Sequence, residues 1–101
     1  MLNTQITLPL DEIRHFCEEQ TIRKLSLFGS VLRDDFNAAS DVDVLVEFEP
    51  GAIITYFDLF DMQERLTAII GHQVDLLTPA ALSPYFRDDV LNQAVAVYER
   101  E

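Results

Sequence analysis

Two aspartates at the start of an apolar run constrain the fold of this chain more than any other feature: Asp41-Val42-Asp43-Val44-Leu45-Val46. The alternation predicts a β-strand over Val42–Phe48 whose valine face packs inward against helices, while the acidic face borders a cleft. Residues two apart in a strand share a face, so Asp41 and Asp43 are expected to point the same way, with Cα atoms about 6.6 Å apart. Carboxylates this close repel each other unless a cation lies between them. Mg²⁺ fits, because it takes oxygen ligands and leaves positions open for substrate phosphates.

A shorter apolar run, residues 25–28, ends at Gly29-Ser30. This pattern predicts a strand that leads into a short helix or turn over residues 30–34. Glycine lets the backbone approach a ligand, and serine can cap the following helix, whose free N–H groups suit a phosphate. Arg33 lies on the first turn of this helix. We expect it either to contact a nucleotide phosphate or to pair with a neighbouring acid.

Asp75 is an acid inside a later apolar run, Val74-Asp75-Leu76-Leu77. A buried carboxylate without a partner is costly, so this position indicates either a functional group or an acid that faces solvent from an edge strand. We favour a functional role for Asp75.

The remaining elements follow from capping residues and hydrophobic periodicity. Thr55 and Asp58 form a capping box at the start of a helix that Gly71 ends, and Pro84 suits the first turn of the last helix. The expected elements are a helix over 7–20, strands over 25–28 and 42–48, a turn at 50–51, helices over 55–70 and 83–93, a strand over 73–77, and a short final strand, or last helical turn, over 94–98. We favour the strand for the last segment. The predicted fold is one α/β (α+β) domain over residues 1–101, with a small mixed sheet of three to four strands flanked by helices.

Charge and composition exclude several classes of protein. The net charge is −11, with 18 acids and 7 bases, so a generic nucleic-acid binder is excluded. Six acids and no base lie between Asp34 and Glu49, which suits a cation site and a basic partner surface. Hydrophobic residues make up 49% of the chain, and no run suits a membrane span or an export signal, so we expect a folded cytoplasmic protein without membrane contact. The single Cys17 cannot form an internal disulfide and is expected in the core, on the buried face of the first helix.

These motifs together resemble a known superfamily. Gly29-Ser30, Ser40-Asp41-Val42-Asp43 at the head of a strand, and Asp75 in a later strand are similar to the signature of the DNA polymerase β-like nucleotidyltransferases. Within it, the chain resembles the minimal nucleotidyltransferases, the antitoxin partners of HEPN-domain RNase toxins, from about Leu10 to the C-terminus. Many relatives have Arg-Gly where this chain has Arg33-Asp34, which puts the local loop geometry in doubt. The resemblance implies the palm fold of that superfamily.

The resemblance also implies an activity and the residues that carry it. It implies Mg²⁺-dependent transfer of a nucleoside monophosphate, with ATP as the expected donor, onto a tyrosine of a cognate HEPN toxin in a hetero-oligomeric complex. Asp41, Asp43 and Asp75 would hold one or two Mg²⁺ ions, and Asp75 could instead orient or deprotonate the attacking hydroxyl. The nucleotide phosphates would bind at Gly29, Ser30 and Arg33.

Two alternatives remain for the function. The chain could be a catalytically silent module that neutralises the toxin by contact, although the intact motif set argues against this. It could also be a subunit of an aminoglycoside-type nucleotidyltransferase. The short stretch after Asp75 disfavours that alternative, because larger relatives have an added helical acceptor domain.

Overall fold

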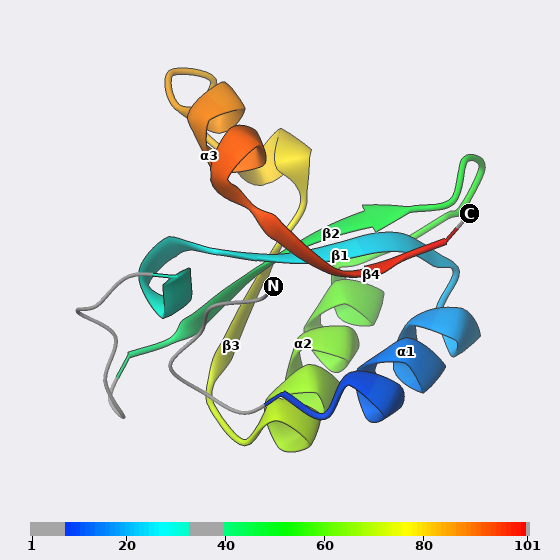
Figure 1. Ribbon diagram of the computed structural model, residues 1–101. Helices are drawn as coiled ribbons and strands as arrows, with labels where there is room; N and C mark the ends of the chain where they lie inside the picture. Colours follow the sequence, from blue (N-terminus) through cyan, green and yellow to red (C-terminus); the bar gives the residue numbers. More distant parts are fainter. Residues whose placement is uncertain (1–7, 33–39, 101) are drawn as a thin grey trace.

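A mixed four-stranded sheet forms the central layer of the computed structural model, which describes residues 8–32 and 40–100. Helices α1 and α2 cover one face of the sheet, and α3 lies on the other side (Figure 1). The elements in chain order are α1 (Leu10–Glu19), β1 (Ile22–Phe28), the 3₁₀ helix η1 (Gly29–Leu32), β2 (Val42–Phe48), α2 (Tyr56–Ile70), β3 (Val74–Leu77), the 3₁₀ helix η2 (Pro79–Ala81), α3 (Arg87–Gln93) and β4 (Val95–Glu99). The predicted fold class is confirmed, and the sheet has four strands, the larger of the two numbers predicted.

The strand order is β3-β2-β1-β4. β1 pairs antiparallel with β2 and with β4, whereas β2 and β3 are parallel. A parallel pair needs a crossover connection, and α2 supplies it. The backbone N–H of Val42 donates to the carbonyl of Gln73 at 2.8 Å, which ties the start of β2 to the chain entering β3.

The main core lies between the sheet and helices α1 and α2. The alternate residues Val42, Val44 and Val46 of β2 are fully buried there, as predicted. Cys17 of α1 is also fully buried, and burial raises the pKa of its thiol to about 12. The expectation that Cys17 is a core residue is therefore confirmed.

A second, smaller core occupies the opposite face of the sheet. Its buried members are Phe28, Leu45 and Leu82, with Leu77 and Val90 packed against them. Leu45 lies on the face of β2 that also carries Asp43, because it is two residues further along the strand. The predicted acidic face is thus only partly open, since η2 and α3 cover its far end.

Helix α2 begins and ends where the sequence predicts. The Thr55 hydroxyl accepts from the backbone N–H of Asp58 at 3.2 Å, and the Asp58 carboxylate accepts from the backbone N–H of Thr55 at 3.0 Å. Gly71 ends the helix in the left-handed conformation, at φ 82°. Met62, Leu66 and Ile70 form the buried stripe of the helix. The capping box and the glycine C-cap are confirmed.

The first two elements differ from the predicted bounds. The first helix begins at Leu10, directly after Pro9, rather than at residue 7, which lies outside the described residues. β1 begins at Ile22 rather than residue 25, because Ile22 already pairs with Phe48 on β2. The polar residues Arg23 and Lys24 hid this extension, since they interrupt the apolar run.

The last helix begins at Arg87, not at residue 83. Ser83 instead organises a turn: its hydroxyl accepts from the N–H of Tyr85 at 3.3 Å, and its carbonyl accepts from the N–H of Phe86 at 3.2 Å. The Arg87 side chain donates to the carbonyls of Pro79 and Leu82, which binds the start of α3 to η2. The final segment is strand β4, as favoured.

β3 is an edge strand whose outer N–H groups are bonded to side chains of α2. The N–H of Val74 donates to the Thr67 hydroxyl at 3.0 Å, and the N–H of Leu76 donates to the Gln63 side-chain oxygen at 2.9 Å. These bonds satisfy donors that would otherwise be open to another strand. Among the described residues, no helix combines the length and apolar character that crossing a membrane requires.

Gln63→Leu is expected to lower the free energy of unfolding by about 1–2 kcal/mol, because Leu76 keeps its N–H but loses the acceptor. Urea denaturation measures the change. Gln63→Glu is the matched control, since it keeps an oxygen at the same distance along the side chain and should lose less. Equal losses in the two variants would show that the hydrogen bond contributes nothing.

Candidate functional site

Asp43 and Asp75 lie side by side on neighbouring strands. The parallel register of β2 and β3 pairs these two residues directly, with Cα atoms about 4.8 Å apart at the usual strand spacing. Their neighbours Val42, Val44 and Val74 are buried in the main core, so both aspartates face the opposite side of the sheet. Asp75 is exposed and Asp43 is half-buried. The fold thus concentrates two carboxylates on a solvent-accessible face.

Asp75 was expected to be either a functional group or an acid that faces solvent from an edge strand, and its position is compatible with both. Asp75 is an acid on an edge strand, and it is exposed rather than buried, so the premise of a costly buried carboxylate was wrong. The same residue nevertheless pairs in register with Asp43. Its edge position makes it accessible, and its register places it beside the other acid.

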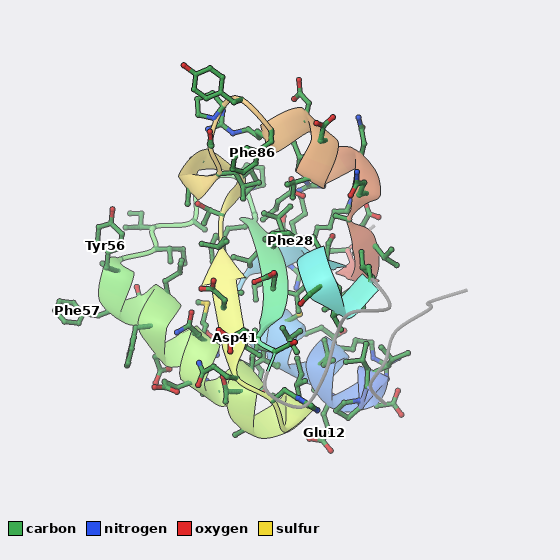
Figure 2. All side chains as sticks on the ribbon, turned by 90° about the vertical axis from the view of Figure 1, so that its left-hand side faces the viewer. Glu12, Phe28, Asp41, Tyr56, Phe57 and Phe86 are labelled. Atoms are coloured by element: carbon green, nitrogen blue, oxygen red, sulfur yellow. The ribbon has the colours of Figure 1, made fainter. Side chains whose placement is uncertain are left out.

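Asp41 lies just outside the strand. β2 begins at Val42, and Asp41 is exposed at its head (Figure 2). Asp41 directly precedes the strand, so the expectation that it points to the same side as Asp43 stays a prediction. Within residues 8–32 and 40–100, no group of three or more His, Cys, Asp or Glu side chains is arranged to hold a metal ion. The arrangement is an adjacent pair with a third carboxylate nearby in the chain.

Gly29 makes room for the Asp43 carboxylate. Phe28 pairs with Asp43 across β1 and β2, and the chain then turns at Gly29 with φ 77°. A Cβ atom at Gly29 would collide with Oδ2 of Asp43 and lie 3.1 Å from its Cγ. The glycine of the Gly-Ser motif and the second aspartate of the Asp-x-Asp motif are thus in direct contact, which gives a physical reason for their joint occurrence.

Ser30 follows at the start of η1 and is half-exposed. It therefore lies one residue from the Gly29–Asp43 contact. Arg33, the third expected phosphate contact, lies outside the described residues, as do Asp34 and Asp35. Its role stays a prediction.

The two glutamates of the 34–49 run pair with arginines. Arg23 donates to Glu47 at 2.9 Å, and Arg100 pairs with Glu49 at 3.2 Å. Both pairs lie at the end of β2 far from Asp43. Among the described acids of this run, the charge near the site therefore comes from Asp41 and Asp43.

Sequence reasoning missed an apolar groove of about 850 Å³ beside the end of β3. The groove runs between the start of α2 and η2, and its lining includes Tyr56, Leu59, Leu76, Leu77 and Ala80. Aromatic residues in the first turn of α2 that do not belong to its buried stripe were the available signal.

Comparison with known proteins identifies the family. Residues 10–97 match the family model described as the nucleotidyltransferase domain. The chain belongs to this family. A Methanocaldococcus jannaschii protein, provisionally named a protein adenylyltransferase, is 37% identical over 76 residues, or 75% of this chain and 80% of the relative. Protein adenylyltransferase MntA of Thermococcus cleftensis is 34% identical over 76 residues, or 75% of each chain.

Solved structures have the same fold. A protein provisionally described as a minimal nucleotidyltransferase matches with a TM-score of 0.70 at 30% identity, over 85% of this chain and 86% of the other. A chain of the complex between the tri-AMPylated HEPN toxin of Shewanella oneidensis and an MNT antitoxin matches with a TM-score of 0.64 at 17% identity, over 90% of this chain and 70% of that one. The resemblance inferred from the motifs is confirmed.

Gly29→Ala is expected to destabilise the nucleotidyltransferase fold more than Gly51→Ala. Both positions have positive φ, which costs an alanine about 1–2 kcal/mol. Only Gly29 has a neighbour in the way, because nothing lies within 4 Å of a Cβ at Gly51. Overpacking against Asp43 should add about 1–3 kcal/mol. Urea unfolding of both variants measures the difference, and equal losses would contradict the Gly29–Asp43 contact.

Proposed function

We propose that this chain is a Mg²⁺-dependent adenylyltransferase that moves AMP from ATP to a hydroxyl group of a partner protein. The observation that carries the proposal is the in-register pair of Asp43 and Asp75, with Asp43 packed against the Gly29 turn, in a member of the nucleotidyltransferase family. The name of the Thermococcus cleftensis relative, a protein adenylyltransferase, supports a protein acceptor.

The donor set fits Mg²⁺ together with a nucleotide. Asp41, Asp43 and Asp75 offer only carboxylate oxygens, which Mg²⁺ prefers. Because the described residues do not form a closed cluster of three ligands, a bound ion would need substrate phosphates and water to complete its shell. A bound Mg²⁺ would neutralise the negative charge that develops on the triphosphate during transfer.

The remaining chemistry falls to the chain's own groups. The Ser30 hydroxyl and the backbone of the Gly29 turn would bind phosphate oxygens next to Asp43. The attacking hydroxyl oxygen forms a bond to the α-phosphorus of ATP, and the bond from this phosphorus to the β-phosphate oxygen breaks. Pyrophosphate leaves with that electron pair. The hydroxyl proton passes to Asp75, whose exposure lets it reach an acceptor on another protein.

We propose a HEPN-domain RNase toxin as the partner, modified on a tyrosine hydroxyl. The motif resemblance supports this choice, as does the shared fold with the Shewanella oneidensis complex of an AMPylated HEPN toxin with an MNT antitoxin. The protein would then act as an antitoxin within a hetero-oligomer.

Asp43→Asn is expected to abolish AMP transfer and leave the protein folded, since the side chain keeps its size and loses its charge. Incubation with labelled ATP, Mg²⁺ and the candidate toxin measures the transfer, and thermal melting checks the fold. Asp75→Asn should also reduce transfer strongly. It should raise the free energy of unfolding by up to about 1 kcal/mol, because it ends the repulsion between the neighbouring carboxylates of Asp43 and Asp75. Full activity of Asp43→Asn would remove the site assignment.

The same assay separates catalysis from simple binding. Label on the toxin that requires Asp43 supports the enzyme. Tight binding that silences the toxin without label would instead support the catalytically silent module. Transfer to an aminoglycoside without any toxin present would support the antibiotic-modifying alternative.

ATP with Mg²⁺ is expected to raise the melting temperature, since it binds the native state. At a concentration 100 times the dissociation constant, the stabilisation should be about 2.7 kcal/mol. Mg²⁺ alone should have little effect, because the described carboxylates do not enclose an ion. Equal stabilisation by ATP in the presence of EDTA would contradict the metal-bridged site.

A further inference from the structure

Large apolar side chains are exposed together at the start of α2. The exposed fraction is 89% for Ile53, 93% for Tyr56, 88% for Phe57 and 61% for Phe60. Figure 2 shows Tyr56 and Phe57 projecting away from the body of the molecule. Scattered apolar residues are normal on a surface, but a contiguous aromatic group indicates an interaction site.

Two members of this group, Tyr56 and Phe60, lie on the flank of α2 that faces β3. Residues 56, 60, 63 and 67 follow one another at helical spacings of three and four, so they form one row along the helix. Gln63 and Thr67 of this row bond the outer N–H groups of β3. Tyr56 and Phe60 therefore lie in the same row, nearer the start of the helix than the two residues that bond the β3 edge.

The groove extends from Tyr56 to the end of β3, the strand that carries Asp75. Its lining includes Tyr56 from α2 and Leu77 from β3. Leu77 lies two residues beyond Asp75, so both side chains are on the same face of the strand. One apolar surface thus leads from the start of α2, around the end of β3, to the face where Asp75 and Asp43 lie.

The surroundings of the aromatic group are negatively charged. On the other flank of α2, Asp58 and Asp61 line a small hollow together with Glu19 of α1. No Lys or Arg belongs to the described lining of this hollow or of the groove. The nearby Arg87 side chain is held by backbone carbonyls, and Arg65 lies over the Phe16 ring at 5.2 Å.

We propose that Ile53, Tyr56, Phe57, Phe60 and the adjoining groove form the docking surface for the acceptor protein. This inference rests on the proposed function. The acceptor would meet the surface with apolar side chains set among lysines and arginines, and docking there would bring its hydroxyl to Asp75. A second copy of this chain is a poorer occupant, because it would place two acidic rims against each other at a net charge of −11 each.

The partner would dock through contacts with these side chains and not by adding a strand to the β3 edge. The N–H groups of Val74 and Leu76, which a new strand at the β3 edge would use, already donate to Thr67 and Gln63. A strand would have to displace both bonds. The exposed aromatic rings need no such rearrangement.

Alanine variants of the aromatic residues test the proposal. The double variant Tyr56→Ala/Phe57→Ala should bind the candidate toxin at least roughly tenfold more weakly and raise the KM for it, as expected for aromatic hot spots. The matched control is Tyr85→Ala, because Tyr85 is 96% exposed but lies in the turn before α3, outside the surface. ATP with Mg²⁺ should shift the melting temperature equally in the wild type, the double variant and Tyr85→Ala. Asp61→Asn should slow association at low salt.

The outcomes separate this proposal from the proposed function. Unchanged toxin affinity in the double variant, with transfer still dependent on Asp43, overturns the docking surface and keeps the enzyme. Weakened binding in the double variant, with a wild type that transfers no AMP, supports the docking surface and overturns the enzyme. A dimer of the isolated chain on a sizing column that the double variant dissociates assigns the surface to a second copy and overturns the proposal.

Discussion

The parallel pairing of β2 with β3 is the interaction on which the site depends. Antiparallel neighbours can be joined by a tight turn, but a parallel pair requires a crossover, so the register of Asp43 with Asp75 requires all of α2. The capping box at Thr55 and the left-handed Gly71 determine where that helix begins and ends. Gln63 and Thr67 then bond it to the outer edge of β3. The helix therefore connects the two strands, covers the core and completes the edge strand.

A second constraint comes from the close approach of β1 and β2. The Asp43 carboxylate packs against the Gly29 backbone, where a Cβ atom would have no room. This contact makes the turn after β1 part of the carboxylate site, although the ten residues 31–40 separate the Gly29-Ser30 motif from the Asp41-Val42-Asp43 motif. A phosphate bound at the turn would lie next to a carboxylate without any further element between them.

Local patterns predicted the elements well where the signal was strong. The alternation over Val42–Phe48 and the caps of α2 identify their elements because each depends on residues near in sequence. Strand order and register depend on distant contacts, so the pattern could not predict the pairing of Asp43 with Asp75 or decide between a buried and an exposed Asp75. Pro84 suggested a helix start, but Ser83 stabilised a turn instead, and the helix began at Arg87. The aromatic residues of α2 were overlooked because the buried stripe alone explained a helix.

The burial of Cys17 gives the protein an internal reporter of local opening. At a pKa of about 12, almost none of this thiol is ionised near neutral pH, and thiol reagents react with the ionised form. Cys17 is the only cysteine of the chain and packs between α1 and the sheet. Its rate of alkylation therefore measures how often α1 separates from the core, and a reagent of suitable size would follow that motion without any introduced label.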